Sequence, residues 1–207
     1  VVGKKSNQTY FFDDEIETVE VNPYWGVPQS IIINEMLPKL RSDPSYLDRL
    51  GYQVTYNGRS VSSSGVNWHA IGRGSVGVRQ PPGNSNALGQ LKILFPNSHA
   101  IYMHDTPSKS LFNRDMRAFS HGCVRLQDPR GMASHVLGIS VDEVGREIAQ
   151  GANKALPVPH RIPVHVSYFT AWAEPGEDVK YYADVYDRDV YLEKAIEATE
   201  AERSASG

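Results

Sequence analysis

A six-residue stretch at 120–125, Ser-His-Gly-Cys-Val-Arg, constrains this chain more than any other part of its sequence. It contains the single cysteine, Cys123, directly after His121 and Gly122. A thiol and an imidazole are the two parts of a cysteine nucleophile and its base. Gly122 permits a tight backbone turn and leaves the approach to the sulfur uncovered. We therefore expect a turn at which the N–H groups around Gly122 and Cys123 face a developing oxyanion.

A second histidine lies upstream, at the end of the short apolar stretch 101–105. This residue, His104, is the candidate general base, which takes the thiol proton and later hands it to a leaving amine. His121 adjoins the nucleophile, so it is either an alternative base or a residue that shapes the pocket. Asp105 is predicted to fix the tautomer of His104, through its side chain or its backbone carbonyl. A free thiol has a pKa of about 8.5, so we expect an imidazolium or aligned N–H dipoles near Cys123.

These stretches resemble the signature of the L,D-transpeptidases, the YkuD-type catalytic domain of bacterial enzymes that cross-link peptidoglycan. The stretch 79–89, Arg-Gln-Pro-Pro-Gly-Asn-Ser-Asn-Ala-Leu-Gly, matches the larger Gram-negative members. So does the stretch 95–107, in which Phe-Pro-Asn leads into Tyr-Met-His-Asp-Thr-Pro. The segments 22–25 and 168–172 also fit, and the matching blocks occur in the right order. The resemblance covers most of residues 1–189, and it implies that His104 is the base and that His121 lines the site.

Six residues are candidates for contact with the substrate. Arg125 has a planar guanidinium that suits a substrate carboxylate, although it can equally brace the loop. Ser120 either forms local hydrogen bonds or lines the pocket. The weaker candidates for the substrate groove are Asn86, Gly89, Tyr102 and Trp68.

The resemblance also implies a reaction. The acyl donor is a peptidoglycan tetrapeptide stem, Cys123 forms a thioester with release of D-alanine, and the side-chain amine of a neighbouring stem completes a 3→3 cross-link. Carbapenem β-lactams are expected to acylate the same thiol. The stretch 120–125 does not encode the acceptor, so hydrolysis of the thioester or attachment of a protein to the wall remains open. A non-enzymatic wall-binding module is the other alternative, and the intact Cys123, His104 and Gly122 argue against it.

Other classes of function find little support in the sequence. The net charge of −3 argues against a nucleic-acid partner. The ligand types His99, His104, His121 and Cys123 lack the paired spacings of zinc sites, so no metal is predicted. The stretch 72–77 matches a Gly-x-Gly-x-x-Gly spacing without a flanking βαβ unit, which is poor support for a dinucleotide site. No cofactor is predicted.

The predicted fold class is α+β, mainly β with peripheral helices, as a bent mixed sheet or sandwich. A catalytic domain over 1–189 contains a helical and loop capping insertion at 28–89, and a C-terminal helix and tail occupy 190–207. The insertion is expected to be a mobile cap, or lid, over the donor groove, because its Gly- and Ser-rich loop 59–77 should make few buried contacts. The chain opens on Val-Val-Gly, which suggests the end of a strand, so we expect an N-terminally truncated fragment. The family implies a periplasmic location.

Local signals predict several element boundaries. Pro28 suits the first turn of a helix that should kink or end near Pro38. Asp43 is predicted to cap a second helix that runs to Leu50. Proline-rich residues 157–163 are expected to form an extended connector. Further predictions are strands at 16–21, 91–95, 100–104, 164–172 and 179–185, and helices from 129, from 141 to 148, and from 191 to 202.

Overall fold

The computed structural model of this chain describes residues 1–72 and 74–205. Arg73, which belongs to the expected lid, and the last two residues of the expected tail lie outside the described residues. The helices are α1 (Gln29–Ile31), α2 (Leu37–Ser42), α3 (Tyr46–Arg49), α4 (Pro129–Leu137), α5 (Val141–Ala149) and α6 (Arg188–Ala205), with the π turn η2 (Ile32–Met36) and the 3₁₀ turns η1 (Lys5–Asn7), η3 (Ser63–Gly65) and η4 (Lys109–Asn113). The strands are β1 (Val2–Gly3), β2 (Phe12–Val21), β3 (Trp25–Gly26), β4 (Gln53–Tyr56), β5 (Arg59–Val61), β6 (Val76–Gln80), β7 (Leu91–Leu94), β8 (Met103–His104), β9 (Ala118–Ser120), β10 (Val124–Arg125), β11 (Lys154–Val166), β12 (Ala171–Trp172) and β13 (Lys180–Tyr181).

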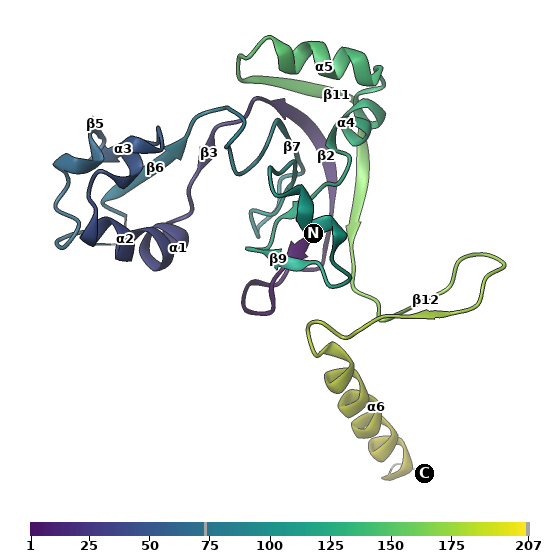
Figure 1. The fold of residues 1–207 in the computed structure, drawn as a ribbon. Coiled ribbons are helices and arrows are strands. Elements are labelled where there is room, and N and C mark those ends of the chain that lie inside the picture. Colours follow the sequence, from purple (N-terminus) through teal and green to yellow (C-terminus); the bar gives the residue numbers. More distant parts are fainter. Residues whose placement is uncertain (73, 206–207) are drawn as a thin grey trace.

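The centre of the molecule is a five-stranded sheet in the order β10-β8-β7-β2-β11. Strands β8 and β10 run parallel and the other neighbours run antiparallel, so the sheet is mixed. Alternate residues of β2 and β7, among them Val19 and Ile93, are buried in one core with Val136 of α4 and Val144 of α5. The two helices therefore cover one face of the sheet (Figure 1). The predicted α+β class, mainly β with peripheral helices, is confirmed.

Both covering helices begin where their capping residues predict. Asp128 accepts a hydrogen bond from the backbone N–H of Gly131 at 2.9 Å, and Pro129 takes the first helical position of α4. Ser140 and Glu143 form a reciprocal capping box at the start of α5. Such caps contribute about 1 kcal/mol each to helix stability, which is why the sequence signals these starts clearly.

The insertion between β2 and β7 folds around a core of its own. It contains the four-stranded sheet β3-β6-β4-β5 and the helices α1 to α3 (Figure 1). Its sheet begins at Trp25, slightly before the expected boundary at Pro28. Leu40, Leu47 and Val54 are buried together in its core. Among the described residues, no helix combines the length and hydrophobicity that crossing a membrane requires.

The expectation that the loop 59–77 has few buried contacts is wrong. Trp68 is 1% exposed in the core of the insertion, and its indole N–H donates to the carbonyl of Ser63 at 2.9 Å. Val66 and Val76 are buried in the same core. The loop is polar in composition, but one large aromatic side chain anchors it.

Prolines mark two places where the elements depart from regular geometry. The helix was expected to kink or end near Pro38, and it is interrupted there by the π turn η2, after which Pro38 lies in the first turn of α2. The expected connector 157–163 is part of β11, which pairs with β2 across a register shift in this region. Strand β11 lies at the edge of the sheet, where a missing N–H is tolerated.

Two other predicted boundaries shift. Asp43 does not cap α3, because it lies at the end of α2, where its carboxylate binds Arg49 and the hydroxyl of Ser45. The strands expected at 164–172 and 179–185 shorten to the hairpin β12–β13, and 164–166 belong to β11. In Figure 1 this hairpin and α6 extend away from the catalytic sheet.

Candidate active site

The parallel pairing of β8 with β10 brings the two predicted catalytic motifs together. Met103 is opposite Val124 and His104 is opposite Arg125 in the ladder. The backbone N–H of Val124 donates to the carbonyl of Tyr102 at 3.1 Å. Cys123 immediately precedes β10, so the sheet places the thiol beside the strand that carries the candidate base.

Ser120 braces the turn that carries Cys123. Its hydroxyl donates to the Cys123 carbonyl at 2.6 Å and accepts from the Gly122 N–H at 3.1 Å. The side chain is 2% exposed, which favours the local hydrogen-bonding role over substrate contact. Gly122 has φ +117°, a conformation that side chains rarely adopt, and its carbonyl accepts from the Thr9 hydroxyl at 2.8 Å.

This bracing changes the expected oxyanion site. The Gly122 N–H already donates to Ser120, so it is not free for a developing oxyanion. Within residues 1–72 and 74–205, the N–H of Cys123 donates to no other group. The structure therefore leaves the Cys123 N–H, rather than that of Gly122, as the open donor in this turn.

Burial dominates the protonation of the half-buried Cys123 thiol. It raises the thiol pKa, while hydrogen bonds from the backbone and hydroxyl of Tyr102 and the charge of Arg125 oppose that rise. The sulfur also lies 3.9 Å from the carbonyl oxygen of Ala100. The resting group is a neutral thiol, which differs from the lowered pKa expected for this type of nucleophile.

The candidate base is held as a neutral imidazole. Burial lowers the pKa of His104 to about 4, against the opposing effect of its hydrogen bond to the Asp105 carbonyl. That carbonyl can only accept, so Nδ1 of His104 carries the proton and Nε2 keeps its lone pair. Of the two possibilities for Asp105, its carbonyl and not its carboxylate contacts His104.

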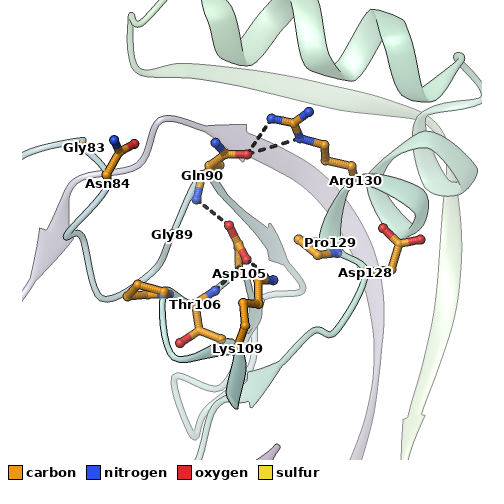
Figure 2. Close-up of a pocket in the computed structure, with 11 residues that line it drawn as sticks. Gly83, Asn84, Gly89, Gln90, Asp105, Thr106, Lys109, Asp128, Pro129 and Arg130 are labelled. Carbon is orange, nitrogen blue, oxygen red and sulfur yellow. Dashed lines mark hydrogen bonds and ion pairs between the residues drawn. The ribbon is translucent and has the colours of Figure 1, made fainter. Parts of the chain in front are cut away.

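The carboxylate of Asp105 fixes the backbone around that carbonyl. It accepts from the N–H of Gln90 at 2.9 Å, from the N–H of Thr106 at 2.7 Å and from Lys109 at 2.6 Å. Figure 2 shows these groups converging at a cavity of about 370 Å³. Gly89 has φ +60°, and a Cβ there would lie 2.3 Å from a carboxylate oxygen of Asp105. Gly89 is therefore required on both conformational and steric grounds.

Arg125 and Tyr102 are the predicted substrate ligands that lie at the site. The buried Nε of Arg125 has no hydrogen-bond partner, and the guanidinium forms no ion pair within the part of the chain that the structure describes. The Tyr102 ring lies 5.8 Å from that of His104, and burial raises the pKa of its hydroxyl. The phenol therefore stays protonated and acts as a hydrogen-bond donor to sulfur.

Asn86 and Trp68 are corrected as substrate ligands. Asn86 is fully buried, and its amide donates to the carbonyls of Pro23 and Pro81. Trp68 lies in the core of the insertion. Both side chains hold loops in place and neither reaches a surface that a substrate can contact.

His121 connects the site to the insertion. Its Nε2 lies 2.6 Å from a carboxylate oxygen of Glu35 in η2. No sequence pattern marks Glu35 as a site residue, because the two partners are 86 positions apart. Gly89, a candidate for the substrate groove, packs against the Asp105 carboxylate. Lys109 was not predicted as a site residue, because periodicity and motif order carry no signal of its contact with Asp105. Among the described residues, no three His, Cys, Asp or Glu side chains converge as a metal site would require.

Comparison with known proteins agrees with this geometry. A protein of Haemophilus influenzae, named "Putative L,D-transpeptidase", is 36% identical over 199 residues, which are 93% of this chain and 40% of that protein. The chain thus spans less than half the length of this relative. Residues 1–166, which contain the paired β8 and β10 and the bracing of the Cys123 turn, match the model of the YkuD L,D-transpeptidase catalytic domain. The chain therefore belongs to the YkuD family of L,D-transpeptidase catalytic domains.

Proposed function

We propose that this chain forms 3→3 peptidoglycan cross-links through a Cys123 thioester, in the bacterial periplasm. The observation that carries the proposal is the arrangement of the two reacting groups. A neutral imidazole lies on β8 and a neutral thiol directly precedes the parallel strand β10, where the unpaired cation Arg125 lies opposite His104 in the ladder. Family membership supports acyl transfer on a peptidoglycan substrate.

The first half-reaction is acylation of the thiol. Nε2 of His104 takes the thiol proton as the Cys123 sulfur bonds to the carbonyl carbon between the third residue of the donor stem and its terminal D-alanine. The N–H of Cys123 donates to the tetrahedral oxyanion, and a donor of this kind contributes about 3–4 kcal/mol. The carbon–nitrogen bond then breaks, and the proton on Nε2 passes to the departing amine. D-alanine is released, and the donor stem remains bound to Cys123 as a thioester.

The second half-reaction reverses the proton transfers. The side-chain amine of an acceptor stem attacks the thioester carbon and gives a proton to Nε2 of His104. The carbon–sulfur bond breaks and the proton returns to the sulfur. Because the Asp105 carbonyl holds Nδ1 throughout, one nitrogen serves as base in the first step and as acid in the next.

Donor recognition is assigned to the two polar groups at the thiol. Arg125 is a half-buried cation with no carboxylate partner among the described residues, so a carboxylate of the stem suits it. Tyr102 donates to the sulfur and stabilises the thiolate as it forms. Both roles are consistent with an anionic peptide approaching the strand ends.

Mass spectrometry of products from purified disaccharide-tetrapeptides tests the proposal. We expect cross-linked dimer, released D-alanine and a Cys123 thioester, and Cys123→Ala should remove all three while remaining folded. Hydrolysed monomer alone would identify a carboxypeptidase, and transfer to a protein amine would identify a wall ligase. The absence of any thioester would contradict the proposal.

A carbapenem supplies a second test of the same thiol. Its strained carbonyl presents the electrophile that the proposed mechanism requires, so we expect one covalent adduct per chain. Intact-protein mass spectrometry before and after incubation measures it, with Cys123→Ala as the control. An unmodified mass after long incubation would contradict the reactive-thiol assignment.

A further inference from the structure

A second cavity borders the catalytic turn at His121. Its volume is about 360 Å³, and residues 5–8, Tyr10, His121 and Arg188 line it. His121 lines this cavity and also contacts the insertion, because its Nε2 lies next to the Glu35 carboxylate. The cavity, called the His121 cavity below, therefore begins two residues from the nucleophile.

Three distant segments hold the walls of the His121 cavity in place. The Thr9 hydroxyl donates to the Gly122 carbonyl at 2.8 Å, which ties the N-terminal segment to the catalytic turn. The buried Tyr186 donates from its hydroxyl to the Gly3 carbonyl at 2.6 Å. Arg188 at the start of α6 donates to the Gln8 side chain at 2.7 Å. The shape of the cavity therefore depends on hydrogen bonds that join the N-terminal segment to the catalytic turn and to the start of α6.

The lining of the His121 cavity favours an anion. Lys5 and Arg188 both line it, and none of its lining residues is acidic. Lys5 is exposed and pairs with Asp187 outside the lining. The guanidinium of Arg188 forms no ion pair with a carboxylate of the described residues and lies 5.2 Å from the centre of the Phe11 ring. Arg188 is therefore the free cation of this cavity.

The His121 cavity does not include Arg125, the residue assigned above to binding the donor stem. Arg125 lies in β10, after Cys123, and pairs with His104 of β8. The cavity is instead lined by His121, before Cys123, next to Gly122, whose carbonyl accepts from Thr9. An acyl transfer between two peptides needs two binding regions that share one nucleophile. Arg125 follows Cys123 by two residues, and His121, which lines the cavity, precedes it by two.

We propose that the His121 cavity binds a carboxylate of the amine-bearing acceptor peptide. This inference rests on the proposed acyl transfer and adds a site for its second substrate. Water carries no carboxylate, so Lys5 and Arg188 raise the local concentration of the peptide acceptor alone. The cavity thereby favours aminolysis of the thioester over its hydrolysis.

A binding measurement tests the site without any turnover. The protein is Cys123→Ala, and the probes are an amine-bearing stem peptide with a free C-terminal carboxylate and the same peptide with that carboxylate amidated. We expect calorimetry to show tighter binding of the free carboxylate by about fivefold to tenfold, as modest exposed ion pairs allow. Lys5→Gln combined with Arg188→Gln should remove this preference. Arg203→Gln removes one positive charge from the same helix, about 22 Å further along α6 given 1.5 Å per residue, and should keep the preference.

A kinetic measurement distinguishes the acceptor from the donor. With tetrapeptide donor and the free-carboxylate acceptor, the Lys5→Gln/Arg188→Gln protein should yield a lower ratio of cross-linked to hydrolysed product, and Lys5→Gln/Arg188→Lys should restore part of it. With the amidated acceptor the ratio should be the same in the wild-type and the doubly substituted protein. The proposal is overturned if the carboxylate preference survives the double substitution, or if thioester formation falls by the same factor as cross-linking. If the wild-type protein forms no thioester but still prefers the free carboxylate, the proposed acyl transfer is contradicted. The assignment of the cavity as a carboxylate-binding site is then still supported.

Discussion

Burial sets the protonation state of both reacting groups. His104 is 5% exposed and its pKa falls to about 4, while the pKa of Cys123 rises, so neither group is charged at neutral pH. A preformed thiolate–imidazolium pair needs the opposite order of pKa values. In the proposed acylation the proton must therefore move during attack on the substrate, and the position of His104 matters more than its charge.

The rate of alkylation at Cys123 reports this protonation state. We expect the rate constant with iodoacetamide to rise steadily with pH through neutrality towards the raised thiol pKa, without a plateau at acidic pH. Acylation by substrate should instead rise as His104 loses its proton near pH 4 and stay level through neutrality, because the neutral base is then present. A plateau of alkylation between about pH 4 and 8, the signature of an ion pair, would contradict this assignment.

Gly89 supports His104 through Asp105. In Gly89→Ala, the added Cβ would lie 2.3 Å from the Asp105 carboxylate, so that carboxylate and its backbone must shift. We expect acylation of the donor to slow by about 100-fold, since a misplacement near 1 Å costs that much. Gly51→Ala is the matched control, because Gly51 has a similar φ of +70° but open space around it. Equal rates in the two variants would show that the contact with Asp105 is unimportant.

The insertion is an element with its own core, and one side chain holds its least regular part. Trp68 fills that core between η3 and β6 and donates to Ser63. Shortening the loop from 60 to 74 would remove this anchor, so such a deletion would not separate a lid function from a loss of folding. A single substitution at the anchor is the more informative change.

Trp68→Ala should lower the free energy of unfolding by about 3–5 kcal/mol, the usual cost of removing a buried tryptophan. The loss should concentrate in the insertion, so hydrogen exchange should accelerate in β4 to β6 before it does in β2 and β7. Trp172→Ala is the control, because that ring is 46% exposed. Uniform acceleration over both sheets would mean that the insertion does not unfold separately.

The predictable elements are those whose signals lie within a few residues. The starts of α4 and α5 were predictable because their caps form hydrogen bonds only with neighbouring residues. The six-residue motif likewise singles out Cys123 from adjacent residues alone, with no knowledge of the fold. The contact of Glu35 with His121 was not predictable, because it depends on how the insertion meets the sheet. The extent of β11 was also missed, since a proline-rich stretch suggests a loop until its place at the edge of the sheet is known.

The stability of the whole molecule should depend on pH through His104. An unfolded histidine has a pKa near 6.5, against about 4 in the fold, so the unfolded chain binds more protons between these values. The free energy of unfolding therefore decreases as pH falls from 6.5 to 4. A pKa difference of about 2.5 corresponds to about 3 kcal/mol, and the loss is complete below pH 4.

Urea denaturation across this pH range measures the effect against His104→Gln, which has no proton to bind. We expect the wild-type protein to lose about 3 kcal/mol more than the variant between pH 6.5 and 4. Other titrating groups are common to both proteins, so the difference isolates His104. Parallel curves for the two proteins would show that the imidazole is not held neutral.

The long edge strand β11 has a consequence for the behaviour of many copies at once. A strand of 13 residues at the margin of a sheet exposes a row of backbone groups that another chain can join. Pro157, Pro159 and Pro163 interrupt that row, because none of them has an N–H to donate. Two copies that meet edge to edge would therefore lack hydrogen-bond donors at these positions, and we expect the prolines to disfavour fibril-like self-association through β11.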